Sequence, residues 1–180
     1  MKGGIRVIAG SAKGRRLETP TWEGLRPTSD RLRETLFNIL APRIPGARVL
    51  DGYAGTGALG IEALSRGAAS VFFVESEDRA YRMIERNLEA CGMRNAAASL
   101  VRARFLDAAG SNAHERFDVV LLDPPYDDPE LNEAVRAGLG ILSDDGVLVL
   151  EHATRVTPPE GAFRTVKSGD SSLSFYRKQA

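Results

Sequence analysis

The stretch "RVLDGYAGTGALGIEAL", residues 48–64, combines a short apolar strand, a glycine-rich turn and an apolar helix. Val49 and Leu50 predict a buried strand, and the glycines that follow predict a tight turn into a helix from about Gly57 to Arg66. This order is typical of an open parallel sheet whose ligands bind at the carboxyl ends of its strands. We therefore expect an α/β fold whose sheet begins at residue 48.

The segments that follow repeat this alternation of strand and helix. We expect strands at 70–75, 99–103, 117–123 and 146–152, helices over about 78–91 and 129–140, and a weaker helical stretch after residue 103. The tail, residues 162–178, predicts two strands joined by a turn at Ser168-Gly169-Asp170. The pattern predicts a doubly wound, Rossmann-like parallel sheet to which a C-terminal hairpin adds an antiparallel strand.

The residues before the sheet predict two further elements, a hairpin and a helix. "GIRVIAGSAKGRRLETP", residues 4–20, predicts a small β-hairpin with basic residues near its turn. Apolar residues at helical spacing predict a helix over 28–40, with Thr28, Ser29 or Asp30 as its cap. We expect a basic hairpin and linker at residues 1–27 and the main domain at 28–180.

Composition limits the class of protein. With 180 residues, 43% of them hydrophobic, the chain suits one globular domain, and neither a membrane-spanning stretch nor a signal peptide is recognisable. Cys91 is the single cysteine, and with two histidines it falls short of a zinc site. We expect a cytoplasmic monomer without a structural metal and without membrane contact.

The net charge of zero hides an asymmetry along the chain. The first 50 residues carry ten Lys and Arg against four acids, a net charge of +6, and the remaining residues therefore carry −6. A basic end on an acidic body predicts a local contact with a polyanion. A solvated basic face without a partner is the alternative.

An acid at the end of the second expected strand limits which ligands could bind. Glu75 ends the expected strand at 70–75, where a carboxylate can accept hydrogen bonds from both hydroxyls of a ribose. NAD and S-adenosylmethionine both carry an unmodified ribose. Asp51 favours the second of these ligands, because a carboxylate before the glycines repels the pyrophosphate of NAD and attracts the ammonium of a methionine moiety. We expect S-adenosylmethionine; a solvent-facing Glu75 is the alternative.

The segment "VVLLDPPYDD", residues 119–128, ends a strand with two prolines and an aromatic residue. Prolines cannot donate to a strand ladder, so Asp123 falls at the carboxyl end of the strand. Asp123 and the rigid Pro124 carbonyl can accept both N–H groups of an exocyclic amine, which turns the nitrogen lone pair toward a methyl donor. Tyr126 offers a flat face to an extruded base. The segment therefore predicts methylation of a planar amino group.

Four segments carry a family resemblance: "RPTSDRLRETLFNIL" (26–40), "DGYAGTGALGIEALSRGA" (51–68), "VFFVE" (71–75) and "LLDPPY" (121–126). Together they resemble the RsmD family of bacterial small-subunit ribosomal RNA guanine-N2 methyltransferases, from Arg6 to the final hairpin, and the first segment is the most specific. The resemblance implies a class I S-adenosylmethionine-dependent methyltransferase fold with a mostly parallel seven-stranded sheet, and a small N-terminal β-hairpin extension. It also implies, as target, a guanine N2 of 16S ribosomal RNA in an assembled or assembling subunit.

Three sets of site residues follow, and two positions depart from the family pattern. The expected cofactor-binding residues are Asp51, Ala54, Gly55, Gly57, Glu75, Ser76 and Phe105. The expected catalytic residues are Asp123, Pro124, Pro125 and Tyr126. The expected RNA-binding residues are Arg6, Lys13, Arg15, Arg16, Arg26, Arg31 and Arg33.

Gly52 stands where the family usually has a large apolar residue. Arg104 stands near the position of an acid or amide that meets the adenine amine, and arginine cannot accept a hydrogen bond. Backbone groups at 104–105 or the Asp107 carboxylate are the substitutes we expect.

The residues leave other functions open. The same pair of acceptors could hold an adenine N6 amine of DNA or another RNA, or a protein glutamine. A ribosome-assembly factor that keeps the fold without catalysis is the alternative from a different class.

Overall fold

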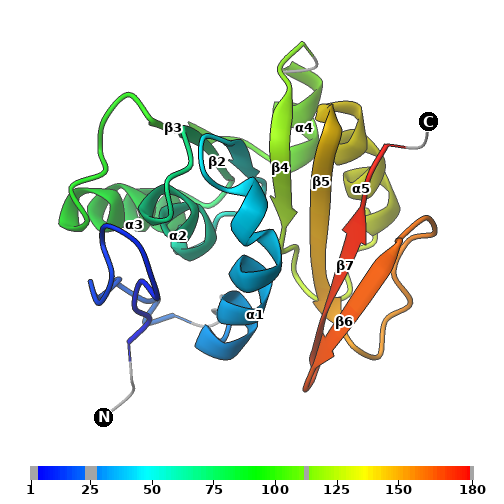
Figure 1. The fold of residues 1–180 in the computed structure, drawn as a ribbon, viewed down its shortest axis with the longest axis horizontal. Helices are drawn as coiled ribbons and strands as arrows, with labels where there is room; N and C mark the ends of the chain where they lie inside the picture. Colours follow the sequence, from blue (N-terminus) through cyan, green and yellow to red (C-terminus); the bar gives the residue numbers. More distant parts are fainter. Residues whose placement is uncertain (1–3, 23–27, 112–113, 179–180) are drawn as a thin grey trace.

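The computed structural model describes residues 4–22, 28–111 and 114–178 (Figure 1). Strands and helices alternate from residue 48 to β5, and two further strands follow, as the sequence predicts. The helices are α1 (Asp30–Leu40), α2 (Ala58–Ser65), α3 (Asp78–Ala90), α4 (Phe105–Ser111) and α5 (Leu131–Gly140), with a short 3-10 turn, η1 (Ala41–Arg43). The strands are β1 (Arg48–Asp51), β2 (Ser70–Glu75), β3 (Ala98–Arg102), β4 (Phe117–Leu122), β5 (Leu142–Ala153), β6 (Arg164–Ser168) and β7 (Ser171–Tyr176).

One seven-stranded sheet runs in the order β3-β2-β1-β4-β5-β7-β6. The pairs from β3 to β5 are parallel, whereas β7 pairs antiparallel with both β5 and β6. The strand order reverses between β1 and β4, and such a reversal opens a crevice at the carboxyl ends of the strands. The predicted parallel sheet and C-terminal antiparallel hairpin are confirmed, and the order is that of a class I methyltransferase fold.

Helices cover both faces of the sheet. α1, α2 and α3 pack on one face, and α4 and α5 pack on the other, behind β4 and β5 in Figure 1. The residues of β4 alternate between the two cores: Val119 and Leu121 join the first, and Val120 and Leu122 join the second. This two-sided burial is why the strand is apolar at every position from Val119 onward.

Two boundaries of these elements bear on the prediction. β5 begins earlier than expected, at Leu142, because Leu142 pairs with Phe117 ahead of an irregularity in the β4–β5 register. α1 begins as predicted after Ser29, whose side chain accepts a hydrogen bond from the Leu32 N–H at 3.2 Å.

The expected N-terminal β-hairpin is not formed as two regular strands. Within residues 4–22 the structure has one antiparallel bridge, between Arg6 and Arg16, which is flanked by backbone hydrogen bonds from the Val7 N–H to the Arg15 carbonyl and from the Leu17 N–H to the Ile5 carbonyl. The turn of this loop binds α2 instead, since the N–H groups of Ile8 and Ala9 donate to the Glu62 carboxylate at 2.8 and 3.0 Å. Backbone donors committed to α2 cannot extend a ladder.

Apolar side chains of the same loop join the core that α1 and α2 form; they are Ile5, Val7, Ala12 and Leu17. The division of the chain at residues 27 and 28 stays a prediction.

Candidate active site

A glycine turn connects β1 to α2 and places backbone N–H groups beside the crevice. Gly55 and Gly57 have φ of 55° and 78°, a region that side chains strain to adopt. A Cβ on Gly57 would also lie 3.1 Å from Ile84 Cγ2 in α3. The positive φ therefore favours glycine at the start of α2, and a side chain there would also press on Ile84.

Asp51 ends β1 and is buried, with 1% of its surface exposed. Its Oδ2 accepts the Gly60 N–H at 3.0 Å, whereas Oδ1 has no hydrogen-bond partner among the described residues. Burial raises the pKa of Asp51 to about 7, the Gly60 hydrogen bond opposes the rise, and the nearby Glu75 charge adds to it. A cation brought to this carboxylate would satisfy the free oxygen and favour its ionised form.

Glu75, at the end of β2, is fixed by two backbone donors. Oε2 accepts the Gly55 N–H and Oε1 accepts the Glu77 N–H, each at 2.8 Å. Each carboxylate oxygen can accept a further hydrogen bond. The side chain is therefore oriented in advance, with acceptor capacity left for a diol.

A cavity of about 160 Å³ lies at the carboxyl ends of the first four strands. Of the predicted cofactor residues, Glu75, Ser76 and Phe105 line it, whereas Asp51, Ala54, Gly55 and Gly57 form the adjoining turn. Sequence reasoning missed Gly52 and Tyr53 as lining residues. A Cβ on Gly52 would come within 2.7 Å of Leu122 Cδ2 and of Phe105 Cδ2, so side chains from β4 and α4 fill the space of the larger residue expected there.

Arg104 lines the same cavity and forms an ion pair with Glu130. This pairing holds the guanidinium at the rim. Asp128 and Glu130, both from the loop after β4, also line the cavity and bring carboxylates that sequence reasoning did not assign. Asp107 is exposed and is not among the lining residues, so the structure does not support the expected substitute from that side chain.

The predicted catalytic segment, residues 123–126, follows β4 directly. Pro124 is buried, whereas Pro125 lines the cavity and Tyr126 is 37% exposed. The Tyr126 hydroxyl lies 2.8 Å from Ser171 Oγ at the start of β7. Asp127 has a φ of 69°, and both of its carboxylate oxygens accept hydrogen bonds from Arg155 at 3.1 Å. The loop therefore presents the tyrosine ring from a fixed position.

Asp123 is held from a distant part of the chain. Its Oδ2 accepts the Thr28 hydroxyl at 2.9 Å, and the same hydroxyl lies 3.1 Å from Glu151 Oε2 in β5. Burial raises the pKa of Asp123 well above its ordinary value, and the charges of Glu151 and Asp51 raise it further, against the Thr28 hydrogen bond. Neither Thr28 nor Glu151 was among the predicted site residues: Thr28 was considered only as a helix cap within the segment 26–40, and no local pattern marks Glu151.

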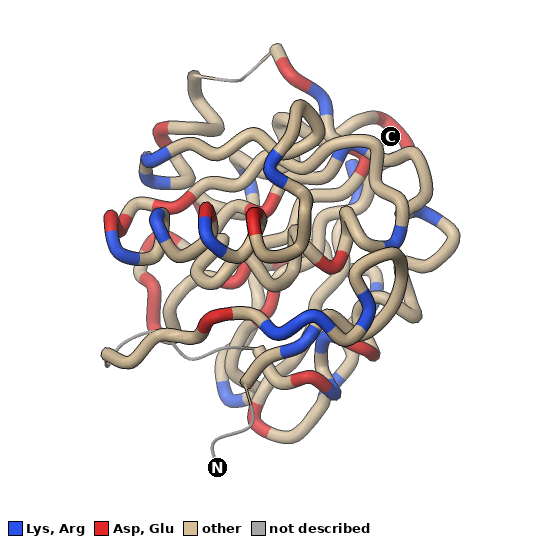
Figure 2. The backbone as a smooth tube through the Cα atoms, turned by 90° about the vertical axis from the view of Figure 1, so that its left-hand side faces the viewer, with Lys and Arg blue, Asp and Glu red and all other residues tan. Residues whose placement is uncertain are grey.

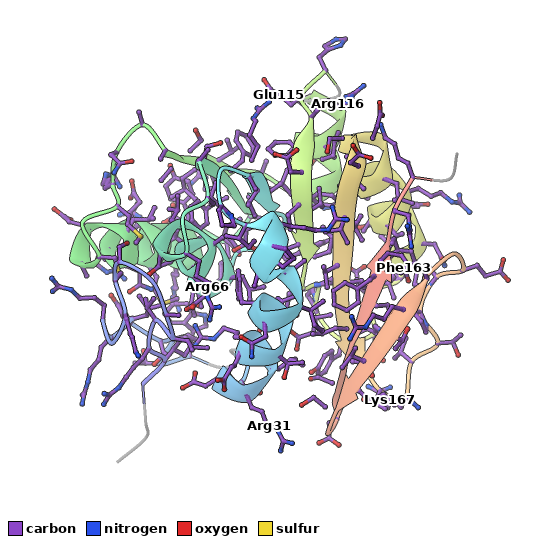
Figure 3. All side chains as sticks on the ribbon, viewed as in Figure 1. Arg31, Arg66, Glu115, Arg116, Phe163 and Lys167 are labelled. Atoms are coloured by element: carbon purple, nitrogen blue, oxygen red, sulfur yellow. The ribbon has the colours of Figure 1, made fainter. Side chains whose placement is uncertain are left out.

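The basic residues of the N-terminal loop lie on the side of the molecule that faces the viewer in Figure 2. Five of the predicted RNA contacts are exposed and form no ion pair among the described residues; they are Arg6, Lys13, Arg15, Arg16 and Arg31. Arg31 points away from the body at the start of α1 (Figure 3). Arg26 lies outside the described residues.

Arg33 corrects the predicted set. It is fully buried, and its Nη2 donates to the Arg6 carbonyl at 2.8 Å and to Asp30 at 2.6 Å. The helical register explains the difference, since Arg33 follows the buried Leu32 on the inner side of α1. A buried guanidinium cannot contact a phosphate, so the expectation for Arg33 was wrong.

The described parts of the chain lack the features of two other kinds of site. Within these residues, the acids, histidines and cysteine form no group of three that could hold a metal ion. No helix within the same ranges is both long and apolar enough to cross a membrane.

Known proteins resemble this chain in sequence and in fold. The family model Conserved hypothetical protein 95 matches residues 5–177. The Ribosomal RNA small subunit methyltransferase D of Haemophilus influenzae is 44% identical over 126 residues, which cover 69% of this chain and 65% of that protein. The structure of hypothetical protein TTHA0928 of Thermus thermophilus has a TM-score of 0.84 at 32% identity and covers 97% of this chain and 99% of that chain.

A more distant likeness concerns the fold alone. The T. thermophilus 16S rRNA N2 G1207 methyltransferase, solved in complex with AdoMet and guanosine, has a TM-score of 0.72 at 24% identity. It covers 88% of this chain and 45% of that chain.

Proposed function

The chain belongs to the Conserved hypothetical protein 95 family, that of the RsmD methyltransferases, and from this membership we propose that it methylates the exocyclic N2 amine of a guanine in small-subunit ribosomal RNA with S-adenosylmethionine as donor. One observation carries the proposal. The same cavity, at the carboxyl ends of the strands, is lined by Glu75, the acid expected to bind the ribose, and by Pro125 of the catalytic segment. A donor held by the first residue therefore lies beside the second.

The residues at the cavity fit the donor. Glu75 would hold the ribose hydroxyls, and the free Oδ1 of Asp51 would accept from the methionine ammonium. Phe105 packs 5.5 Å from Tyr53, centroid to centroid, and both rings border the space beyond Glu75. When bound, S-adenosylmethionine supplies a methyl group on a positively charged sulfur.

The catalytic segment would hold the acceptor. Asp123 and the Pro124 carbonyl accept the two N–H groups of the guanine amine, and the Tyr126 ring supports the base by stacking. The Ser171 contact fixes the tyrosine hydroxyl at 2.8 Å, so the ring is in place before the base arrives.

The exposed basic residues of the N-terminal loop and α1 would bind the phosphates of the RNA around the target. They are five of the ten Lys and Arg of the first 50 residues, and none of the described acids forms an ion pair with them. The substrate that suits such a separate basic surface is structured RNA within an assembled or assembling subunit, approached by a single copy of the chain.

The test is to map the methylated nucleotide after incubation with unmethylated small subunits and labelled donor. We expect one guanine carrying an N2 methyl group. Asp123→Asn keeps a carbonyl acceptor and should retain part of the single-turnover rate, whereas Asp123→Ala should lose about a hundredfold or more. Label in an adenine or in protein, or none with a folded protein that binds donor, would refute the proposal.

A further inference from the structure

Three side-chain oxygen atoms meet beside the predicted catalytic segment: Thr28 Oγ1, Asp123 Oδ2 and Glu151 Oε2. They come from three separate parts of the fold. Thr28 precedes α1, Asp123 follows β4 and Glu151 lies near the end of β5, at sequence separations of 95 and 123 residues from Thr28. Glu151 is 6% exposed. Two acidic side chains that converge on one half-buried hydroxyl are costly to assemble. Perturbed acids of this kind are common at functional sites.

The Thr28 hydroxyl has a single proton and two carboxyl neighbours. It can donate a full hydrogen bond to one of them at a time, so the two carboxyl groups are linked through that proton. The contact is made to Oδ2 of Asp123, and no described residue donates to Oδ1. The bridge therefore fixes the carboxyl plane and leaves one oxygen to accept from an incoming amine.

We propose that Thr28 and Glu151 are positioning residues for Asp123: Thr28 orients the carboxylate toward the target amine, and the Glu151 charge makes it a better acceptor for the proton that methylation releases. The inference rests on the proposed function. In the transfer step the N2 lone pair forms the N–C bond while the C–S bond breaks, and the nitrogen becomes positively charged. Its proton then passes to the carboxylate of Asp123, which leaves a neutral methylamino group.

The two positioning residues act on Asp123 in opposite senses. Burial is the largest cause of its raised pKa; the Glu151 charge, and less strongly that of Asp51, also raise it, whereas the Thr28 hydrogen bond lowers it. These are the described charged and hydrogen-bonding groups that influence Asp123 from β5, β1 and the segment before α1. Removing the Glu151 charge should therefore lower the pKa of Asp123, and removing the Thr28 hydroxyl should raise it.

The experiment compares Thr28→Val, Thr28→Ser and Glu151→Gln, with Thr35→Val as the matched control. The Thr35 hydroxyl contacts the Arg31 carbonyl on the exposed side of α1, away from the carboxyl pair. Single-turnover methyl transfer to unmethylated subunits is measured across pH at saturating donor, with donor affinity from calorimetry. The acid limb of the profile reports ionisation of Asp123.

We expect Thr28→Val to slow transfer by about tenfold or more with donor affinity unchanged, and to move the acid limb to higher pH. Thr28→Ser should have the wild-type rate and an acid limb at the wild-type pH. Glu151→Gln should move the limb to lower pH, and Thr35→Val should match the wild type. Limbs that coincide with the wild type in both variants, or that move in the same direction, would overturn the proposal.

A second readout does not depend on catalysis. Carbon-13 NMR of aspartate carboxyl groups in the free protein follows the titration of Asp123, which Asp123→Asn assigns. The same opposite displacements should appear there even if transfer to subunits fails, so failure of the proposed substrate is distinguishable from failure of this inference. Unchanged titration in folded Thr28→Val and Glu151→Gln proteins would refute the inference alone.

Discussion

Replacing Asp51 by asparagine should stabilise the free protein at alkaline pH and weaken its hold on the donor. Asp51 is 1% exposed, and burial raises its pKa from 3.8 to about 7. Between these two values the folded protein binds more protons than the unfolded chain, so the free energy of unfolding falls as pH rises. The interval corresponds to about 4 kcal/mol of lost stability above pH 7.

Asparagine has no charge to bury and so avoids that cost. Its carbonyl can still accept the Gly60 N–H, but its amide would lack a partner where Oδ1 now lies, which costs about 1–3 kcal/mol. We therefore expect Asp51→Asn to gain about 1–3 kcal/mol at pH 8 and to lose about 1–3 kcal/mol at pH 4, where the wild-type acid is neutral and only the cost of the unpaired amide remains.

Urea unfolding at pH 4, 6 and 8 measures this difference, and calorimetry at pH 8 measures donor affinity. The variant should bind S-adenosylmethionine more weakly by about 1.5–3 kcal/mol, the range for a hydrogen bond to a charged group. Asp78→Asn is the control, because ion-pairing with Arg102 lowers the pKa of that exposed acid and no gain at pH 8 should follow. A variant no more stable than the wild type at pH 8, or one that binds donor equally well, would show the reasoning to be wrong.

Two further predictions concern the cavity and the catalytic loop. Glu75→Ala should weaken donor binding by about 1–3 kcal/mol, since a charged acceptor is lost, and equal calorimetric affinities of variant and wild type would remove Glu75 from the ribose site. Tyr126→Phe keeps the ring and loses the Ser171 contact, so its single-turnover rate should fall little, whereas Tyr126→Ala loses a stacking platform of about 1–3 kcal/mol. Equal rates for the two Tyr126 variants would argue against stacking.

The parts of the fold that the sequence predicted are those coded by local patterns. The apolar strands, the glycine turn and the proline stop each follow from a few adjacent residues, and the strand ends then bring Glu75 and Pro125 to one cavity. The order β1-β4 at the centre of the sheet follows from the handedness of the connections. The place of the cavity in the fold could therefore be predicted from the sequence.

The features that were missed depend on contacts between distant residues. Glu62 accepts a hydrogen bond from the Ile8 N–H across 54 positions and so ties the N-terminal loop to α2, and the Thr28 hydroxyl meets Asp123 across 95 positions. Thr28 lies in the segment that carries the family resemblance, but its residue type indicated only a helix cap, since Ser and Thr are common before helices for capping alone. Arg33 was misjudged for a related reason: charge predicts exposure, and only the packing of α1 shows that this side chain faces inward.

Arg33 also supplies a test of which charges bind RNA. The slope of log binding constant against log salt concentration reflects how many protein cations displace counterions from RNA phosphates. Each lost phosphate contact should therefore reduce this slope by about one. Arg15→Gln and Arg16→Gln, both at exposed positions, should therefore each flatten the slope for small-subunit RNA. Arg33→Met removes the same charge from a position enclosed by Asp30 and the Arg6 carbonyl, and should leave the slope unchanged in protein that remains folded by circular dichroism. A slope that falls equally in all three variants would mean that only net charge matters, and the N-terminal loop would then be a solvated basic face.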